Sequence, residues 1–333
     1  MVTMTTVAAM AHVSVSTVSH VVNGTRPVSP ETRSRVLQAM DALGFEHHPI
    51  ARSLQSGSAR TIGLALTAAS NPYWTDLVSG IDLAASAAGL SLIMVDTRDE
   101  PRHEATVVAN LLAHHVDGLI VAPSGGWEGQ LLPMLRDRAT PYVLIDRTGP
   151  VRVDQVAVES EQSSAAVVEH LLVQGHRRVA VVTGAPGLST SEDRERGYRL
   201  AHARLGVPVD EALVVCGGST EHGGRSATLR LLSEIDPPTA LFTSNNLMTI
   251  GALGALRQLG RRVPDDLALV SYDDFSWAEV FSPSLTTVAQ PLRDLGRTAV
   301  QLLVRRLNDP QAPTQIVRLP AEIRHRESCG CLA

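Results

Sequence analysis

The chain has 333 residues, of which 44% are hydrophobic and 19% are charged. This composition is typical of a globular protein and excludes a disordered one. The length fits two or three domains, each with its own core. The net charge of −5 excludes a uniformly basic nucleic-acid coat. It does not exclude a small DNA-reading module, because such binding depends on where the positive charge lies.

The cysteines and the N-terminus indicate the compartment. Cys216, Cys329 and Cys331 are too few for a disulfide framework, and Cys329-Gly-Cys331 is spaced more tightly than the usual CxxC metal knuckle. We therefore expect no metal and no cofactor. The N-terminus has no basic start followed by a sustained apolar run, and no apolar stretch approaches the length of a membrane span. A cytoplasmic protein without a membrane partner is predicted.

The first 46 residues are predicted to form three short helices. The first follows Thr5-Thr6, which are its possible N-cap. The second begins near Ser14 or Val15, carries valines at helical spacing and ends at Asn23-Gly24. The third begins with Ser29 as its N-cap, followed by a proline at its first position.

Residues 47–60 are polar and rich in serine, and they contain Pro49 and Gly57. Ile50, Ala51 and Leu54 form a short apolar trio at helical spacing. An isolated helix of this length is unstable in water. The segment is therefore predicted to be a linker that becomes helical when a partner covers it.

From about residue 61 onward, apolar strands alternate with amphipathic helices. Strands are predicted at Ile62–Leu66, Leu90–Val95, Gly118–Val121, Tyr142–Ile145, Gln155–Val158, Arg178–Val182, Leu213–Cys216, Ala240–Thr243 and Leu267–Tyr272. Helices are predicted, for example, at Tyr73–Ala88, Glu104–His114, Ser163–Gln174, Glu195–Arg204 and Met248–Leu259. The alternation predicts parallel sheets with helices on both faces. About nine strands exceed one Rossmann-like sheet, so two α/β subdomains with a ligand cleft between them are expected.

A series of short motifs runs through the chain. It includes Val13-Ser14-Val15-Ser16-Thr17-Val18-Ser19, Val28-Ser29-Pro30-Glu31-Thr32-Arg33, Ala51-Arg52-Ser53-Leu54, Ser70-Asn71-Pro72, Val116-Asp117-Gly118-Leu119-Ile120, Tyr272-Asp273-Asp274 and Arg326-Glu327-Ser328. Each motif is weak alone. In order and spacing, from about Thr5 to about Ser328, they resemble the LacI/GalR family of bacterial transcription regulators.

The resemblance implies an all-α helix-turn-helix head with a hinge helix, joined to an α/β sensor of two Rossmann-like parallel-sheet subdomains, as in periplasmic binding proteins. The implied boundaries are 1–46 for the head, 47–60 for the hinge and 61–333 for the sensor, with an N-subdomain of about 61–159 plus 290–320 and a C-subdomain of about 160–289 plus 321–333.

A helix-turn-helix reads DNA with the N-terminal residues of its second helix, which lies in the major groove. The DNA-binding residues expected in the head are Thr5, Ser14, Val15, Ser16, Thr17, His20 and Asn23. Val15 is expected to contact a thymine methyl group, and Thr5 and Asn23 to contact phosphate. The family usually has Gly where this chain has His12 and Arg where it has His20. The preferred operator bases are therefore expected to differ.

In relatives the linker folds into a hinge helix on the operator, and a leucine enters the minor groove. Leu54 matches that leucine, and Arg52 is expected to meet phosphate. Wedging an apolar side chain between base steps costs a few kcal/mol of unstacking, in rough terms, and yields a bent DNA with more contacts. His47-His48 replace the family's usual Pro-Asn pair, which leaves the start of the hinge open.

The expected effector contacts follow strand ends or match family positions. They are Asn71, Tyr73, Trp74, Asp146, Arg194, Asn245 and Asp273. Carboxylates, amides and an arginine framed by aromatic rings suit a hydroxyl-rich ligand such as a sugar or nucleoside. In the alternative interpretation, Arg194 and Asp273 form only an ion pair. Ser219 and Asn246 replace residues that are common in the family, so the identity of the ligand stays open.

Three functions are weighed against these features. The leading hypothesis is a homodimeric repressor that binds a pseudo-palindromic operator under the control of a small effector. No tetramerisation heptad follows Ser328, which favours a dimer. A sugar-binding module without DNA function would have an export signal in place of the helix-turn-helix. An α/β enzyme would have a clustered acid–base or nucleophile set, and none is recognisable in the sequence.

Overall fold

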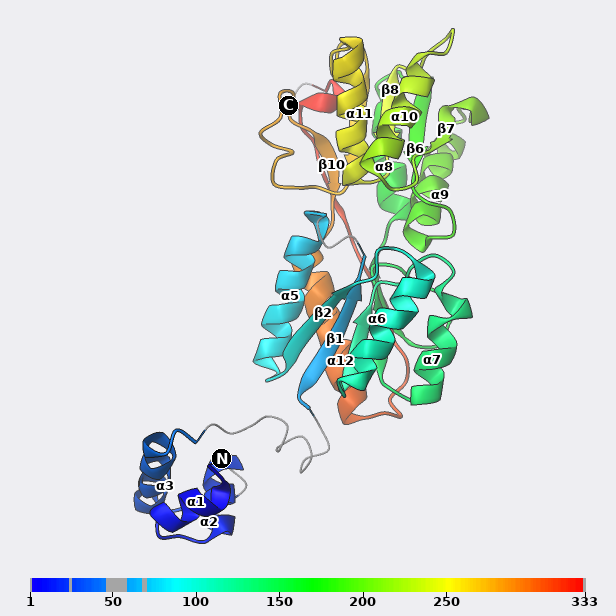
Figure 1. The fold of residues 1–333 in the computed structure, drawn as a ribbon. Helices are drawn as coiled ribbons and strands as arrows, with labels where there is room; N and C mark the ends of the chain where they lie inside the picture. Colours follow the sequence, from blue (N-terminus) through cyan, green and yellow to red (C-terminus); the bar gives the residue numbers. More distant parts are fainter. Residues whose placement is uncertain (1, 24–25, 46–58, 68–70, 332–333) are drawn as a thin grey trace. The chain divides into compact units, whose positions relative to one another are not determined.

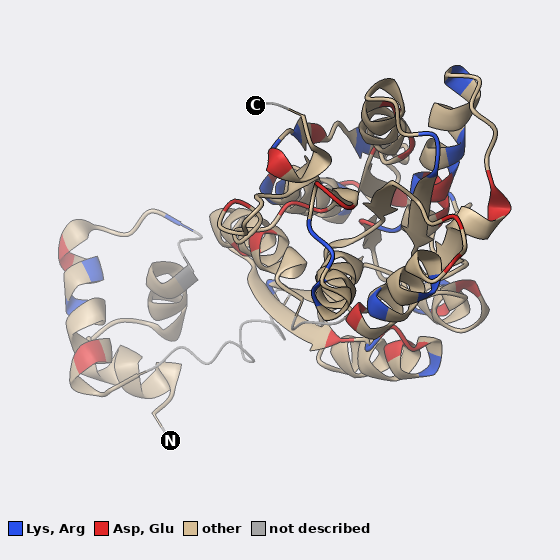
Figure 2. Ribbon diagram, turned by 90° about the horizontal axis from the view of Figure 1, so that it is seen from above, with Lys and Arg blue, Asp and Glu red and all other residues tan. Residues whose placement is uncertain are grey.

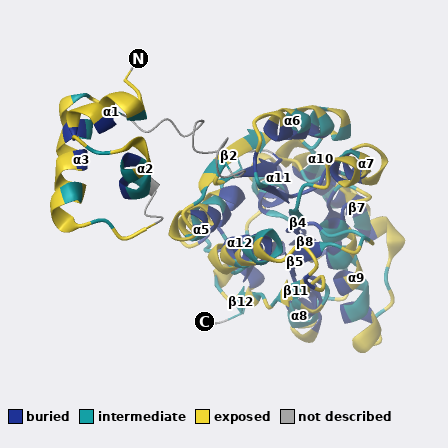
Figure 3. Cartoon of the chain, turned by 90° about the horizontal axis from the view of Figure 1, so that it is seen from below, coloured by how far each residue is buried: buried dark blue, intermediate teal, exposed yellow. Residues whose placement is uncertain are grey.

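The structure is a computed structural model that describes residues 2–23, 26–45, 59–67 and 71–331. It contains two compact units, Met1–Ala59 and Arg60–Ala333, which we call the head and the body. Figure 3 shows that buried residues gather inside each of them. Figure 2 shows that basic and acidic residues are interspersed over the body.

The head is a bundle of three helices. They are α1 (Met4–Met10), α2 (Val15–Asn23) and α3 (Pro30–Ala42). Their buried residues are Val7, Ala8, Ala11, Val18, Val21, Val36 and Ala39. Ser29 caps α3 as predicted. The predicted cap of α1 is wrong: Thr3 accepts from the backbone of Thr6 in a capping box, so the helix begins earlier and includes Thr5.

The body has two lobes, which are stacked in Figure 1. The N-lobe has a six-stranded sheet in the order β11-β5-β4-β3-β1-β2. Its elements are β1 (Thr61–Leu66), α5 (Tyr73–Ala87), β2 (Ser91–Asp96), α6 (Pro101–Ala113), β3 (Gly118–Val121), η1 (Trp127–Gly129), α7 (Leu131–Arg138), β4 (Tyr142–Ile145), β5 (Asp154–Val158), α12 (Leu292–Asn308) and β11 (Ile316–Leu319).

The C-lobe has a second six-stranded sheet in the order β12-β10-β9-β8-β6-β7. Its elements are α8 (Glu161–Val173), β6 (Val179–Thr183), α9 (Ser189–Arg204), η2 (Glu211–Leu213), β7 (Val214–Cys216), α10 (Glu221–Leu232), β8 (Ala240–Thr243), α11 (Asn246–Leu259), β9 (Ala268–Tyr272), β10 (Thr286–Ala289), β12 (Glu322–Arg324) and η3 (Glu327–Cys329).

The two sheets are parallel except for β12, which pairs antiparallel with β10. The inner strands β3, β5, β6, β8 and β9 are buried along their whole length, as expected where helices cover both faces of a parallel sheet. The chain passes between the lobes after β5, after β10 and after β11. Each lobe is therefore built from segments that are distant in the sequence.

The predicted fold class is confirmed, and each of the nine predicted strands is present within one residue of its predicted ends. Three further strands, β10 to β12, were not predicted. They are short, and β10 opens with Thr286-Thr287, which interrupts the apolar pattern. Helix α9 begins at Ser189, whereas the predicted start was Glu195. The prediction missed the first turns because they are polar and carry no apolar stripe.

No single helix in the part of the chain that the structure describes is long and apolar enough to cross a membrane. Helices α1 and α2 reach the required length and apolar character only when they are taken together, and they are bent by 105° relative to each other. Their apolar sides form the core of the head.

Candidate DNA interface and ligand cleft

The N-terminus of α2 is capped and presents its first turn to solvent. The Ser14 hydroxyl accepts from the backbone N–H of Thr17 at 3.1 Å and contacts the hydroxyl groups of Ser16 and Thr17 at 2.7 and 2.8 Å. Val18 is buried on the opposite side. Val15 is 43% exposed although it is apolar. Single exposed apolar side chains are common on protein surfaces, so this exposure is compatible with the predicted DNA contact of Val15.

The structure places the other predicted DNA-binding residues of the head as follows. Ser16 and Thr5 are exposed, Thr17 and His20 are half-buried, and Asn23 is the last residue of α2. Arg52 and Leu54, like the rest of the predicted hinge up to residue 58, lie outside the described residues.

His12 stands in the turn between α1 and α2 with a φ of 54°. This is the left-handed region, which glycine adopts without steric cost and other residues adopt at a small cost. The backbone conformation explains the glycine that the family usually carries at this position. His12 is therefore tolerated there with some local strain.

The seven predicted effector residues come together in one cleft of the body. The cleft has a volume of about 410 Å³, and its lining includes Asn71, Tyr73, Trp74, Asp146, Arg194, Asn245 and Asp273. All but Arg194, which comes from α9, follow strands of the two sheets. The carboxyl ends of parallel strands are where α/β folds place their ligand sites. A volume of this size suits a small metabolite.

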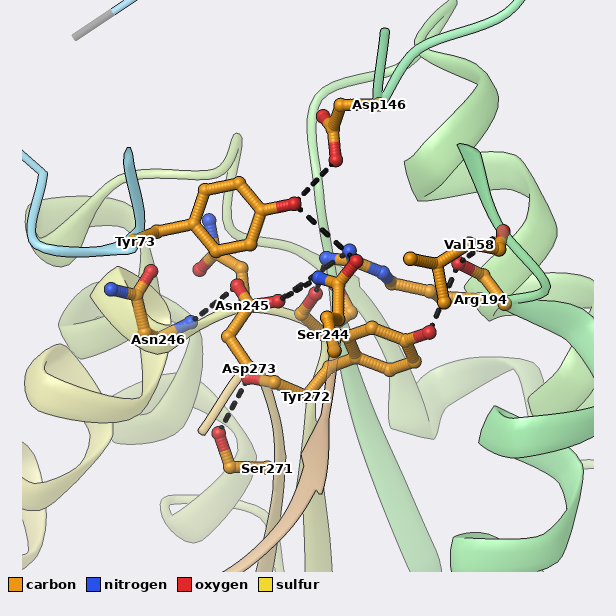
Figure 4. Close-up of polar contacts among 12 residues, drawn as sticks. Tyr73, Asp146, Val158, Arg194, Ser244, Asn245, Asn246, Ser271, Tyr272 and Asp273 are labelled. Carbon is orange, nitrogen blue, oxygen red and sulfur yellow. Dashed lines mark hydrogen bonds and ion pairs between the residues drawn. The ribbon is translucent and has the colours of Figure 1, made fainter. Parts of the chain in front are cut away.

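Two buried carboxylates occupy equivalent places in the two lobes. Asp146 follows β4 and Asp273 follows β9, and each of these strands is third in its sheet. Both have left-handed backbones, with φ of 65° and 72°. Residues held in this region cluster at functional sites. The Tyr73 hydroxyl donates to Asp146 at 2.6 Å, as Figure 4 shows.

Arg194 extends from α9 into the cleft and is 6% exposed. Its guanidinium donates to the Ser244 carbonyl at 2.6 Å and lies 3.8 Å from the centre of the Tyr272 ring. It also pairs with Asp273 at 3.6 Å. The ion pair of the alternative interpretation is thus present. Arg194 still lines the cleft, however, and its Nε and the Ser244 hydroxyl are buried without a hydrogen-bond partner among the described residues.

Burial perturbs two of these groups. It raises the pKa of Asp273 above the ordinary carboxyl range, against the opposing effect of the Arg194 guanidinium. Burial also raises the pKa of Tyr73 well above its ordinary value, and the Asp146 carboxylate adds to that shift. The Tyr73 hydroxyl therefore keeps its proton and remains a donor at neutral pH.

Two lining residues of the cleft, and Gln290, which contacts lining residues, were not predicted. Arg147 forms a salt bridge with Asp99, and both line the cleft. Gln290 accepts from the Tyr73 hydroxyl at 3.3 Å and donates to Asp273 at 2.6 Å. Arg147 directly follows the predicted Asp146, so the strand-end rule was a usable signal for it. Gln290 lies where the chain passes between the lobes, and the sequence carries no signal for that position.

Further polar contacts between described residues join the lobes around the cleft, besides the hydrogen bond from Gln290 to Asp273. The amide groups of Asn71 and Asn246 form reciprocal hydrogen bonds at 2.7 and 3.4 Å. The backbone N–H of Thr148 donates to the Ser189 hydroxyl at 2.9 Å. An ion pair joins Arg318 to Asp193 at 3.6 Å. A ligand that prefers another tilt of the lobes would exchange these contacts for others.

Glu104 in α6 is a buried carboxyl near the Arg147–Asp99 pair. Its Oε1 accepts from the backbone N–H and the hydroxyl of Ser124 at 2.8 and 3.1 Å. Its Oε2 is buried without a partner among the described residues. Burial raises the pKa of Glu104 from 4.5 to about 7.

We expect the Glu104→Gln variant to gain stability over the parent as pH rises. The folded chain holds the Glu104 proton more tightly than the unfolded chain does. This contribution to stability is complete below pH 4.5 and lost as pH rises through about 7, an effect of at most about 3 kcal/mol. Glutamine keeps the acceptor for Ser124 and cannot ionise. Urea unfolding from pH 5 to pH 8 measures this, with the exposed Glu128→Gln as control. Parallel curves for the Glu104 variant and the parent would disprove the burial argument.

Known protein families match both the helical head and the two-lobed body. Residues 3–47 match the family model "Bacterial regulatory proteins, lacI family", and residues 168–329 match a periplasmic binding protein-like domain. The transcriptional repressor PurR of Aliivibrio fischeri is 33% identical, over 98% of each chain.

Two solved structures are similar over the whole chain. The complex of the transcriptional regulator CelR with cellobiose is 32% identical, with a TM-score of 0.75, over 98% of this chain and 100% of that one. The Lac repressor dimer bound to operator and the anti-inducer ONPF is 28% identical, with a TM-score of 0.88, over 98% of this chain and 99% of that one. The resemblance seen in the sequence motifs is thus confirmed. The chain belongs to the LacI family of bacterial transcription regulators.

Proposed function

We propose that this regulator is a homodimeric repressor whose affinity for a pseudo-palindromic operator is set by a sugar or nucleoside in the cleft. The observation that carries the proposal is the convergence of seven polar and aromatic side chains, from both lobes, on one cavity of the body. The relatives are repressors. We therefore propose that the cleft binds its ligand without converting it.

The cleft chemistry favours a hydroxyl-rich ligand. Asp146 and Asp273 accept from hydroxyl groups, Asn245 can donate and accept, and the Trp74 ring offers a face to apolar ring atoms. The Arg194 guanidinium lines the cleft, and its N–H groups suit a ligand hydroxyl or ring oxygen as acceptor. The solved CelR relative holds cellobiose, which is of this chemical class.

Control of DNA affinity requires that the ligand distinguish two arrangements of the lobes. The inter-lobe contacts of Asn71, Thr148 and Arg318 are the ones that a change of tilt would exchange. A coupling of about 1–3 kcal/mol is typical of such systems and corresponds to a 5- to 150-fold change in affinity. The ligand thereby shifts the operator-bound population.

The dimer is proposed to form through the N-lobe. A groove between α5 and α12 is lined by Leu83, Ala84, Ala87, Val300 and Val304, together with charged residues such as Arg297, and Leu83 is 63% exposed. The edge strand β2 also exposes apolar side chains, Ile93 and Met94. Apolar surface of this kind marks a protein interface. The Lac repressor relative is a dimer.

The DNA contacts are proposed as the sequence predicts them. Direct reading of bases is assigned to Val15, Ser16, Thr17 and His20 at the start and along the exposed side of α2. Thr5, Ser14, Asn23 and Arg52 are assigned to phosphate or to positioning, and Leu54 to the minor groove. We also propose that residues 47–60 form the hinge.

Selection from a pool of random duplexes tests the proposal. At moderate salt we expect a twofold-symmetric site to be enriched and bound about 10³-fold or more tightly than random duplex. In a parallel thermal-shift screen of sugars and nucleosides, a cleft ligand present at 100 times its Kd stabilises the chain by about 2.7 kcal/mol. That ligand should also change operator affinity. Absence of any preferred symmetric site, with and without the metabolites, would refute the proposed function.

A further inference from the structure

Four potential metal ligands meet at the C-terminal end of the body, away from the residues that line the cleft. His170 in α8, and His325, Cys329 and Cys331 after β12, have donor atoms that all lie within 4.8 Å of one another. The Nε2 of His170 is 3.4 Å from the Cys329 sulfur, and the two imidazole rings are 4.5 Å apart. The sulfurs of Cys329 and Cys331 are 2.7 Å apart, and both cysteines are free.

The fold holds these side chains in place independently of their own contacts. The Ser328 hydroxyl donates to the Leu269 carbonyl at 2.7 Å and accepts from the Thr286 backbone at 2.8 Å. Glu327 accepts from the backbone N–H of Ser284 at 2.8 Å. Cys329 is fully buried in the core of the C-lobe. The tail that carries three of the four groups is therefore fixed to the strands before any ion binds.

The donor set determines which ion fits. Two thiolates and two imidazoles around one point form the S₂N₂ set that favours tetrahedral Zn²⁺. With Zn–S near 2.3 Å and Zn–N near 2.05 Å, ligand atoms in such a site are about 3.3–3.8 Å apart. Side-chain rotations that move the donor atoms by about an ångström convert the observed cluster into that geometry. In this change the two sulfurs move apart from their separation of 2.7 Å.

We propose that His170, His325, Cys329 and Cys331 bind one Zn²⁺ ion, which fastens the C-terminal tail to α8. Binding replaces the thiol protons of Cys329 and Cys331, which leave to solvent as two protons. It also replaces the contact of 2.5 Å between the Gln174 amide and His170 Nε2. His325 is exposed, so the ion enters from the surface.

The site could not be predicted from the spacing of the cysteines in the sequence. Cys329-Gly-Cys331 alone fits no common zinc motif, and no metal was expected on that ground. The second half of the ligand set comes from His325, close by, and from His170, which precedes the tail by more than 150 residues. Only the antiparallel return of β12 beside β10 places them together.

Cobalt substitution in the full-length chain tests the proposal. The reduced chain, stripped with a chelator, is titrated with Co²⁺ and then with Zn²⁺. We expect one equivalent of cobalt per chain, with the visible bands of four-coordinate cobalt and a near-ultraviolet thiolate-to-cobalt band, both abolished by one equivalent of zinc. Zinc should also raise the Tm of the chain.

Variants decide whether these four residues are the ligands. His325 is exposed and Cys331 is half-buried. Loss of an outer-sphere partner typically costs roughly 10- to 100-fold in metal affinity, and we expect Cys331→Ser and His325→Ala, which each remove a ligand, to weaken zinc binding by more than that. Cys216→Ser and His176→Gln, which lie outside the cluster, should bind as the parent does. Six-coordinate cobalt spectra, substoichiometric binding, or equal affinities in the parent and Cys331→Ser would each overturn the proposal.

Discussion

Arg194→Ala is expected to abolish the response to the cleft ligand while operator binding by the ligand-free chain persists. Arg194 is the cation of the cleft that contacts both Asp273 and the Ser244 carbonyl. The head, which makes the DNA contacts, is a separate compact unit with its own core. Titration of operator affinity by fluorescence anisotropy, with and without the ligand, measures both properties in one experiment.

Removal of Arg194 also leaves the buried Asp273 without its positively charged partner. Breaking a buried pair in this way costs about 3–5 kcal/mol, so a second variant separates the loss of recognition from the loss of folding. Arg194→Lys keeps a positive charge near Asp273 but lacks the planar set of donors. We expect it to stay folded and to bind the ligand at least about 100-fold more weakly, equivalent to ~2.7 kcal/mol.

Arg204, the last residue of α9, provides a control on the same helix. Its side chain is exposed and pairs with Glu169, so Arg204→Ala should respond to the ligand as the parent does. A full ligand response in Arg194→Lys would show that Arg194 serves only the ion pair. The assignment of Arg194 to ligand recognition would then be wrong.

Gly251→Ala is expected to destabilise the C-lobe by about 1–3 kcal/mol or more, because it overpacks a helix crossing. A Cβ atom at Gly251 in α11 would lie 2.1 Å from the Glu221 carbonyl oxygen and 2.6 Å from the Arg225 nitrogen, both in the backbone of α10. Backbone atoms of a helix cannot rotate away as a side chain does. The two helices must therefore separate.

Gly254 lies one turn further along α11 and is the matched control. A Cβ atom there meets nothing within 4 Å. Gly254→Ala should stabilise the chain by about 0.5–1 kcal/mol, because alanine loses less backbone entropy than glycine in a helix. Thermal unfolding of the two variants should therefore shift Tm in opposite directions. Equal shifts would contradict the close packing of α10 on α11.

Local patterns account for much of the fold. Runs such as Gly118–Val121 and Ala240–Thr243 are apolar along their whole length and were predicted because buried parallel strands have no polar face. The short strand β11 (Ile316–Leu319) has an alternating pattern of exposure and lies at an edge of its sheet. In the sequence alone, four residues with this pattern cannot be distinguished from a loop, because the neighbouring strand that pairs with them is not known.

The candidate cleft was accessible to prediction because its residues follow strands. Asp146, Asn245 and Asp273 each stand within two residues of a strand end, where the topology of α/β sheets gathers side chains. Gln290 and His170 could not be found in this way. Gln290 contacts Tyr73, and His170 contacts the C-terminal tail, across more than 100 residues of chain, and only the assembled lobes reveal these pairings.

The order in which the chain passes between the lobes has a consequence for its synthesis. The outer strands β11 and β12 come from residues 316–324, so neither sheet of the body is complete until those residues have left the ribosome. The head is contiguous and folds from residues 2–45. Since domains generally fold as units, N-terminal first, the nascent chain has a DNA-binding module before it has a means of regulating it.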